Sequence, residues 1–187
     1  QLQKMQANPD EWRCPEGFEK GTAGMNFLDP VDSYYHYPWG LYSGGHAHLD
    51  TEKSDEREPM VQGRDRSKTM ILGDSGGFQL ATGVIKMDWS NAKEPNDPAR
   101  TEFCSKILNW LEHTADWSMT LDVPAFAAVG KLSERTGLTE FQDTLDISLL
   151  NLDYFLRNRN PEATKFLNVL SGSNEENSKT WYDAVKH

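Results

Sequence analysis

Three times after residue 68, a short apolar run ends at a polar residue and is followed by a segment with helical periodicity. The runs are residues 69–72, 117–121 and 166–170, and they stop at Asp74, at Asp122 and at Ser171-Gly172. Short apolar runs bounded in this way are typical of buried strands. Because a crossover helix returns the chain to start the next strand in the same direction, this alternation predicts a parallel sheet.

The helices that follow the runs have start signals of their own. Asp97-Pro98 is an N-cap residue followed by proline at the first helical position, and apolar residues then recur at helical spacing. A second helix is expected over about residues 139–157, where apolar residues form one stripe, and a third over residues 175–186.

The carboxyl ends of parallel strands meet at one edge of a sheet, so Asp74, Asp122 and Ser171-Gly172 are expected to lie together. Barrel and doubly wound enzymes build their sites at this edge. Three β/α units make at most half of an eight-stranded barrel. We therefore expect an α/β protein of the (β/α)8 TIM-barrel type, with only the N-terminal part of the barrel in this chain.

The segment before the first run has a different character. Residues 1–67 are rich in turn formers, which predicts an irregular segment that packs on the barrel, while residues 68–187 hold the β/α units. The charge-rich run 51–66 is expected to be a solvated loop or a frayed helix. One aromatic cluster in this segment either stacks bases or covers the N-terminal opening of the barrel. It comprises Tyr34, Tyr35, Tyr37, Trp39 and Tyr42.

The charge of this 187-residue chain limits its partners. Its formal net charge is −10, so any contact with nucleic acid must be local or supplied by other sequence. No apolar stretch reaches the roughly 20 residues of a membrane helix, and the start does not resemble a signal peptide, so we expect a cytoplasmic protein without membrane contact. The chain begins without Met and ends inside a predicted helix, which favours a fragment.

Cysteine and histidine usage gives no clear metal or disulfide pattern. Cys14 and Cys104 lie far apart, and neither belongs to a spacing typical of zinc sites, so a disulfide is not indicated. His46 and His48 form a compact pair with His36 nearby, but no carboxylate or cysteine completes a recognised ligand spacing. Loop histidines are the favoured interpretation.

The most specific motif follows the first apolar run. It reads Gly73-Asp74-Ser75-Gly76-Gly77-Phe78-Gln79. Its adjacent glycines let the backbone turn sharply and expose amide N–H groups to a ligand. Phe78 offers a flat apolar face to a planar ring, and Gln79 offers a donor and an acceptor. The simpler alternative is a tight turn in which Asp74 caps the next helix.

Part of this motif also matches the nucleophile segment of trypsin-like serine proteases, with Ser75 as the nucleophile. That hypothesis requires an all-β double barrel, whereas the flanking segments have the β/α pattern. Residue 78 is Phe where those proteases usually have Pro, and no segment resembles their histidine motif. The motif also lacks the glycine spacing of a dinucleotide-binding loop.

Asp122 supplies a second carboxylate at the end of the next run, directly before Val123-Pro124. Taken alone it could be an N-cap or a turn former. Two carboxylates on one edge can have different roles, because one can accept hydrogen bonds from a ligand while the other exchanges protons with it. Guanine suits such a pair, since its N1–H and exocyclic amine form two donors that one carboxylate can accept.

Residues 74–79 resemble the signature of the tRNA-guanine transglycosylases, the queuine and archaeosine enzymes, which fold as (β/α)8 barrels and exchange guanine for a 7-deazaguanine. The resemblance covers roughly residues 68–187. It is closer to the branch that inserts 7-deazaguanines into DNA, found in phages and bacterial modification islands. The segments that suggest this branch are Ala81-Thr82-Gly83, residues 167–170, Glu175-Glu176 and Trp181-Tyr182.

The resemblance implies a role for each matching residue. Asp74 would contact the base and transfer protons, Asp122 would recognise the edge of guanine, and Phe78 would lie near the base plane. Ser171-Gly172 would contact the base as a turn, but Ser171 stands where the tRNA enzymes have Gln, which shortens its reach. The remaining residues of the implied site are Ser75, Gly76, Gly77 and Gln79.

The resemblance also implies parts that this sequence does not show. The family's nucleophilic Asp and its Cys/His zinc site belong to later barrel strands, and neither can be located here. We therefore expect a pentosyltransferase whose complete form exchanges guanine in DNA for a preQ0-like base, with the base extruded from the duplex and the rest of the barrel either missing from this sequence or supplied by a second chain. The alternatives are a tRNA substrate, or a non-catalytic half barrel that binds a purine or a partner.

Overall fold

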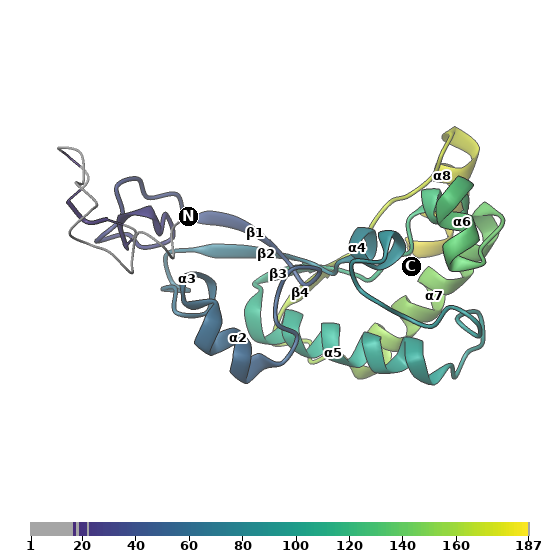
Figure 1. Ribbon diagram of the computed structural model, residues 1–187, viewed down its shortest axis with the longest axis horizontal. Coiled ribbons are helices and arrows are strands. Elements are labelled where there is room, and N and C mark those ends of the chain that lie inside the picture. Colours follow the sequence, from purple (N-terminus) through teal and green to yellow (C-terminus); the bar gives the residue numbers. More distant parts are fainter. Residues whose placement is uncertain (1–16, 18, 22, 187) are drawn as a thin grey trace.

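Four short strands form one parallel sheet in the computed structural model, which describes residues 17, 19–21 and 23–186. Their order across the sheet, β1-β2-β3-β4, is also their order along the chain (Figure 1). They are β1 Trp39–Ser43, β2 Met70–Asp74, β3 Trp117–Met119 and β4 Lys165–Leu167. The predicted α/β class is confirmed, while closure into a barrel stays a prediction because the described strands form an open sheet.

The helices follow the strands as the β/α pattern requires. Those of the described residues are α2 Thr51–Arg57, α3 Pro59–Gln62, α4 Gly77–Thr82, α5 Pro98–Thr114, α6 Gly130–Thr136, α7 Phe141–Asn158 and α8 Glu175–Val185, with 3-10 turns η2 Ala23–Met25 and η3 Ala125–Ala128. The predicted start of α5 is confirmed, since the Arg100 N–H donates to the Asp97 carboxylate at 2.7 Å and Pro98 lies in the first turn. None of the described helices is long and apolar enough to cross a membrane.

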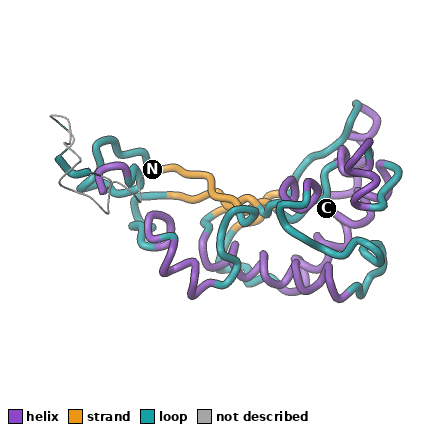
Figure 2. The backbone as a smooth tube through the Cα atoms, viewed as in Figure 1, coloured by secondary structure: helices purple, strands orange, loops and turns teal. Residues whose placement is uncertain are grey.

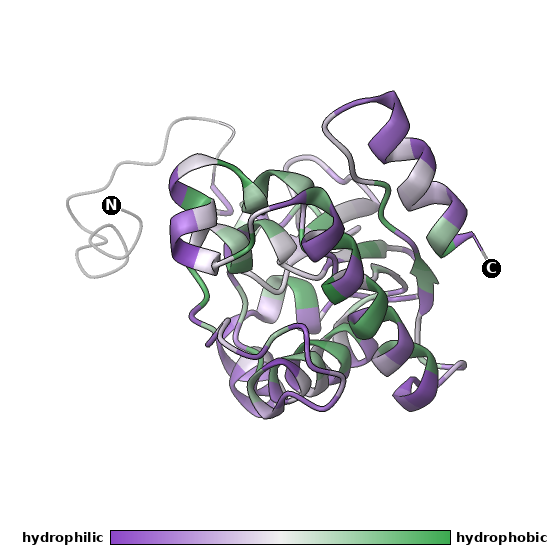
Figure 3. Ribbon diagram, turned by 90° about the vertical axis from the view of Figure 1, so that its right-hand side faces the viewer, coloured by the Kyte–Doolittle hydropathy of each residue, from purple (hydrophilic) through white to green (hydrophobic). Residues whose placement is uncertain are grey.

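The core lies between the sheet and α5. Ile107, Trp110 and Leu111 of α5 are fully buried. The helix approaches β2 closely at Gly73, where a Cβ atom would lie 2.7 Å from Leu111 Cδ2. Figure 3 shows apolar residues concentrated in the middle of the molecule and polar residues on the outer helices, including the one next to the C-terminus. One face of the sheet is therefore sealed by helix packing.

The opposite face of the sheet is bare. Figures 1 and 2 show α2, α3 and α5 on one side of the strands, with no described element over the middle of the other side. Apolar side chains line a groove of about 650 Å³ there, namely Trp39, Leu41, Met70, Leu72, Trp117 and Leu167. Parallel sheets are normally covered on both faces, because their strands carry apolar residues on both. Since alternate residues of a strand share a face, Asp74 ends β2 on this same bare face.

The segment predicted to be irregular contains part of the sheet, which corrects that expectation. Within residues 1–67, β1 pairs in parallel with β2 from Trp39↔Met70 to Ser43↔Asp74. The charge-rich run after it is helical, and α2 begins at the N-cap Asp50, whose carboxylate accepts from the Lys53 N–H at 3.2 Å. The turn formers around β1 mark the ends of a five-residue strand rather than an irregular region.

The predicted aromatic cluster divides between two environments. Tyr35 and Tyr37 stack on each other before β1 starts, with ring centroids 6.4 Å apart, and both are exposed. Tyr42 instead packs into the core against Trp110, at a centroid distance of 5.6 Å. The exposed pair thus precedes the amino end of β1, while the site predicted from the sequence lies at the carboxyl ends.

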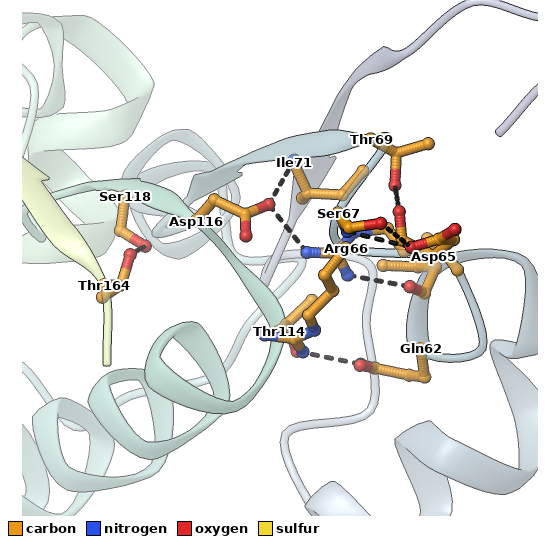
Figure 4. Close-up of polar contacts among 12 residues, drawn as sticks. Gln62, Asp65, Arg66, Ser67, Thr69, Ile71, Thr114, Asp116, Ser118 and Thr164 are labelled. Atoms are coloured by element: carbon orange, nitrogen blue, oxygen red, sulfur yellow. Dashed lines mark hydrogen bonds and ion pairs between the residues drawn. The ribbon is translucent and has the colours of Figure 1, made fainter. Parts of the chain in front are cut away.

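Hydrogen bonds and an ion pair connect the segments at the amino edge of the sheet (Figure 4). The Arg64 guanidinium, whose side chain is 0% exposed, lies 2.8 Å from Asp116 Oδ2 just before β3 begins. The same carboxylate oxygen accepts a hydrogen bond from the Ile71 N–H of β2 at 2.8 Å. Nearby, Gln62 Nε2 donates to Thr114 Oγ1 at 2.8 Å. Asp116 therefore joins the loop after α3 to β2 and to the start of β3, and Arg64 compensates its charge.

Cys104 of α5 lies in the hydrophobic core as a free thiol. Burial raises the pKa of this thiol to about 12, so it stays protonated and behaves as a small apolar residue. Cys14, the other cysteine of the sequence, lies outside the described residues.

Candidate functional site

Asp74 ends β2 at the carboxyl edge of the sheet, directly beside the end of β1. The register pairs it with Ser43, and the Ser43 hydroxyl donates a hydrogen bond to Asp74 Oδ2 at 2.5 Å. The second oxygen, Oδ1, accepts a weaker hydrogen bond from the Gly76 N–H at 3.3 Å. Because Ser43 comes from the strand that the sequence did not reveal, this partner was missed.

The two glycines after Ser75 are required by close approach of other segments. Gly76 has φ +83° and is the N-cap of α4, and a Cβ atom there would lie 2.8 Å from the backbone nitrogen of Gly45. At Gly77 a Cβ atom would lie 2.9 Å from Asp122 Oδ1. The loop between β2 and α4 therefore sits against both the β1 loop and the Asp122 carboxyl. The alternative in which Asp74 is the N-cap of this helix is wrong, since Gly76 has that position.

Ser75 has a structural role. Its side chain is buried, and its hydroxyl donates to the backbone oxygen of Thr120 at 3.1 Å. This hydrogen bond ties the loop after β2 to the end of β3. A buried hydroxyl on a parallel α/β sheet has neither the exposure nor the fold that a trypsin-like nucleophile requires, so the protease hypothesis is not supported.

Asp122 is the second carboxylate of the carboxyl edge, but it does not end the strand as predicted, because β3 stops at Met119 and Asp122 lies in the loop that follows. It is half-buried, and among the described residues no cation pairs with it and no other residue donates a hydrogen bond to its side chain. Burial raises the pKa of its carboxyl group to about 6, and the nearby charge of Asp74 contributes to the increase. The effect of Asp74 on the pKa of Asp122 shows that the two side chains lie within electrostatic reach of each other, as the sequence predicted. Asp122 can therefore change its protonation state near neutral pH.

Gln79 reaches from α4 toward the loop after β1. Its Nε2 lies 3.2 Å from His46 Nε2, an arrangement in which the amide donates when that ring nitrogen carries no proton. Its Oε1 is buried and has no hydrogen-bond partner in the described part of the chain. Buried polar atoms of this kind are uncommon in folded proteins. His46 thus joins the site as a neighbour of Gln79.

Two phenylalanine rings lie on the segments that adjoin the carboxylates. Phe78, at the start of α4, is 59% exposed, and Phe126 of η3 is 40% exposed. Their centroids are 5.7 Å apart, and the rings meet edge to face. The sequence did not identify Phe126 as a candidate site residue, because an aromatic residue among alanines is expected to be buried.

The predicted turn Ser171-Gly172 lies after β4. The Ser171 hydroxyl accepts a hydrogen bond from the Ala125 N–H of η3 at 3.1 Å. Gly172 faces α8 instead, because a Cβ atom there would lie 2.5 Å from Ser178 Oγ. Ser171 thus adjoins the turn that follows Asp122, and a direct contact with a base stays a prediction.

No group of three or more His, Cys, Asp or Glu side chains that could hold a metal ion occurs in the part of the chain that the structure describes. His46 contacts Gln79, and the His48 N–H donates to Glu58 Oε1 at 2.8 Å. The described residues therefore do not fit the zinc site that the resemblance implies for later strands.

The site at the carboxyl edge can hold a ligand that presents hydrogen-bond donors. It combines a hydrogen-bonded carboxylate, a second carboxylate that titrates near pH 6, and exposed aromatic rings. Comparisons of the chain with protein-family models, with curated proteins and with solved structures each found no match.

Proposed function

We propose that the carboxyl edge is the base-recognition half of a guanine transglycosylase site, which exchanges guanine in DNA for a 7-deazaguanine of the preQ0 type. The observation that carries the proposal is the pair of carboxylates Asp74 and Asp122, of which Asp122 has a pKa of about 6 and no cation beside it among the described residues. The resemblance of residues 74–79 to the family signature supports the choice of base and reaction. That resemblance also favours DNA over tRNA.

Guanine presents the donors that this site lacks. Its N1–H and exocyclic amine can donate two parallel hydrogen bonds to an ionised Asp122, and hydrogen bonds to a charged acceptor are stronger than neutral ones. Binding therefore offsets part of the cost of keeping this carboxylate charged in a half-buried place. Asp74, oriented by Ser43, is then the group that exchanges a proton with the base.

Displacement at the sugar C1′ also needs a nucleophilic carboxylate. Our proposal assigns base recognition and proton transfer to the described residues, and assigns the nucleophile to further β/α units, which belong either to a longer form of this chain or to a partner chain. The bare apolar face between β1 and β4 supports this assignment, because additional strands would cover it. A purine-binding half barrel without catalysis would use the same pocket.

Calorimetric titration with guanine and with preQ0 tests the pocket. Asp122→Asn is expected to weaken binding at least about tenfold, because the amide replaces one acceptor by a donor and removes the charge. Asp153→Asn is the matched control, since Asp153 lies on the surface of α7 and pairs only with Arg157 in the described structure. Adenine, which lacks the N1–H donor, should bind weakly to all three proteins. Equal guanine affinity of the wild type and Asp122→Asn would contradict the proposal.

A further inference from the structure

The aromatic pair Phe78 and Phe126 is not needed for the core. In α4 the buried residues are Gly77, Leu80 and Ala81, and in η3 they are Ala125 and Ala127. Each segment thus turns its only large aromatic residue toward solvent. Phenylalanine is among the residues most often buried in proteins, so two exposed rings in contact require an explanation.

The two rings belong to segments that adjoin Asp122. Gly77, which precedes Phe78, packs against Asp122, and Phe126 follows Asp122 by one short turn. The edge-to-face contact leaves ring surface open to solvent, as the exposures of 59% and 40% show. A planar group bound at Asp122 would therefore lie next to the segments that carry these rings.

Two cations lie on α6, the helix that follows η3, although Arg135 also shares a pocket with the acidic residues Asp88, Glu94 and Glu134. The Arg135 guanidinium of α6 lies against Gly83, the C-cap of α4, and Lys131 lies in the first turn of α6, shortly after η3. Both residues are exposed, and neither belongs to any of the ion pairs within the described structure, although Glu134 lies between them in α6. These cations can contact a phosphate group without disturbing the fold.

We propose that Phe126, together with Phe78, forms a stacking subsite for the nucleobase next to the target guanine in an unpaired DNA strand, with Arg135 and Lys131 on its phosphates. Aromatic rings beside local positive charge are the usual means of binding single strands without regard to sequence. The inference rests on the proposed function for the identity of the target base. It makes Phe126 a substrate contact that neither the motif nor the carboxylates provide.

Fluorescence anisotropy with a labelled single-stranded DNA of about ten nucleotides, containing one guanine, tests this subsite. Replacing the flanking nucleotides by abasic sites should weaken binding to the wild type about five- to 100-fold, the effect of losing one stacked base. Phe126→Leu should weaken binding of the intact strand by a similar factor and be insensitive to the abasic replacement. Phe126→Trp should retain binding, and Val129→Ala, a change at an exposed residue next to η3, should have no effect.

Calorimetry with free guanine separates this inference from the proposed function. Unchanged guanine affinity in Phe126→Leu, together with weakened DNA binding, is the expected result. Equal DNA affinity of Phe126→Leu and the wild type would overturn the stacking subsite and leave the guanine pocket intact. Failure of the wild type to bind guanine, with DNA binding that still depends on Phe126, would instead overturn the pocket and retain the subsite.

Discussion

The two edges of the sheet both carry aspartates, but they provide opposite surroundings for them. At the amino edge, Asp116 accepts a hydrogen bond from the Ile71 N–H and pairs with the buried Arg64 guanidinium. At the carboxyl edge, Asp122 has neither kind of partner among the described residues, and burial raises the pKa of its carboxyl group. The negative charge of an aspartate is thus balanced by a cation and a hydrogen-bond donor at one edge, and has neither partner at the other within the described structure.

This difference separates a structural role from a binding role. A compensated carboxylate contributes to stability because its partners are part of the fold. An uncompensated one costs free energy that a ligand can recover by supplying donors, and groups of this kind cluster at functional sites. On this comparison the amino edge holds the sheet together and the carboxyl edge is available to a ligand.

The largest effect is expected from Asp116→Asn. The substitution leaves the Arg64 guanidinium buried without a counter-ion, and breaking such a pair costs about 3–5 kcal/mol of unfolding free energy. Urea denaturation at pH 7 measures the loss. Asp65→Asn is the control, because its ion pair with Lys68 is exposed and its loss should cost less than about 1 kcal/mol. Similar losses in the two variants would show that Asp116 is not the compensated residue that we infer.

The same substitution at the other edge should act in the opposite direction. Because the folded-state pKa of Asp122 is raised to about 6, the folded protein holds this proton more tightly than the unfolded chain does. That stabilising contribution is fully present below about pH 4 and is lost as the pH rises through about 6. Asp122→Asn removes the titration, so it should nearly match the wild type at pH 4 and exceed its stability by about 3 kcal/mol at pH 7. Denaturation curves across this pH range test the sign, and a destabilised variant at pH 7 would contradict it.

A smaller effect is expected at Ser43. Ser43→Ala removes the hydroxyl that orients Asp74, with an expected cost of about 1 kcal/mol in stability and a reduction in guanine affinity of less than tenfold. Ser118→Ala removes a comparable buried hydroxyl, which contacts Thr164 Oγ1 at 3.1 Å away from the site. Only the Ser43 variant should change guanine binding in calorimetry. Equal affinities of the two variants would show that Asp74 needs no positioning by β1.

The sequence predicts those parts of the fold that carry repeated local signals. The strands near residues 70, 117 and 166 and the helices after them follow from apolar runs, helical stripes and the Asp97-Pro98 cap. β1 could not be predicted in this way, because its five residues lie among turn formers and are stabilised by pairing with β2. A strand whose stability comes mainly from its neighbour has a weak local pattern.

The site was predictable only where a residue ends a recognisable strand. Asp74 ends β2 and satisfies this condition, while Asp122 follows β3 closely enough for the parallel sheet to bring it to the same edge. Ser43, His46 and Phe126 do not, since their contacts depend on the register of β1 and on how η3 packs. Ser75 shows that a residue inside the most specific motif need not belong to the site. Its hydroxyl donates to the backbone oxygen of Thr120 and holds the loop in place.

The pH dependence of guanine binding tests the central claim most directly, namely that Asp122 is an uncompensated carboxylate that accepts the donors of a purine. Binding requires the ionised carboxylate, so the wild-type affinity should fall as the pH is lowered through about 6, approaching a tenfold loss per pH unit below it. Asp122→Asn should bind weakly at every pH. A wild-type affinity for guanine that is the same at pH 5 and pH 7 would contradict the account.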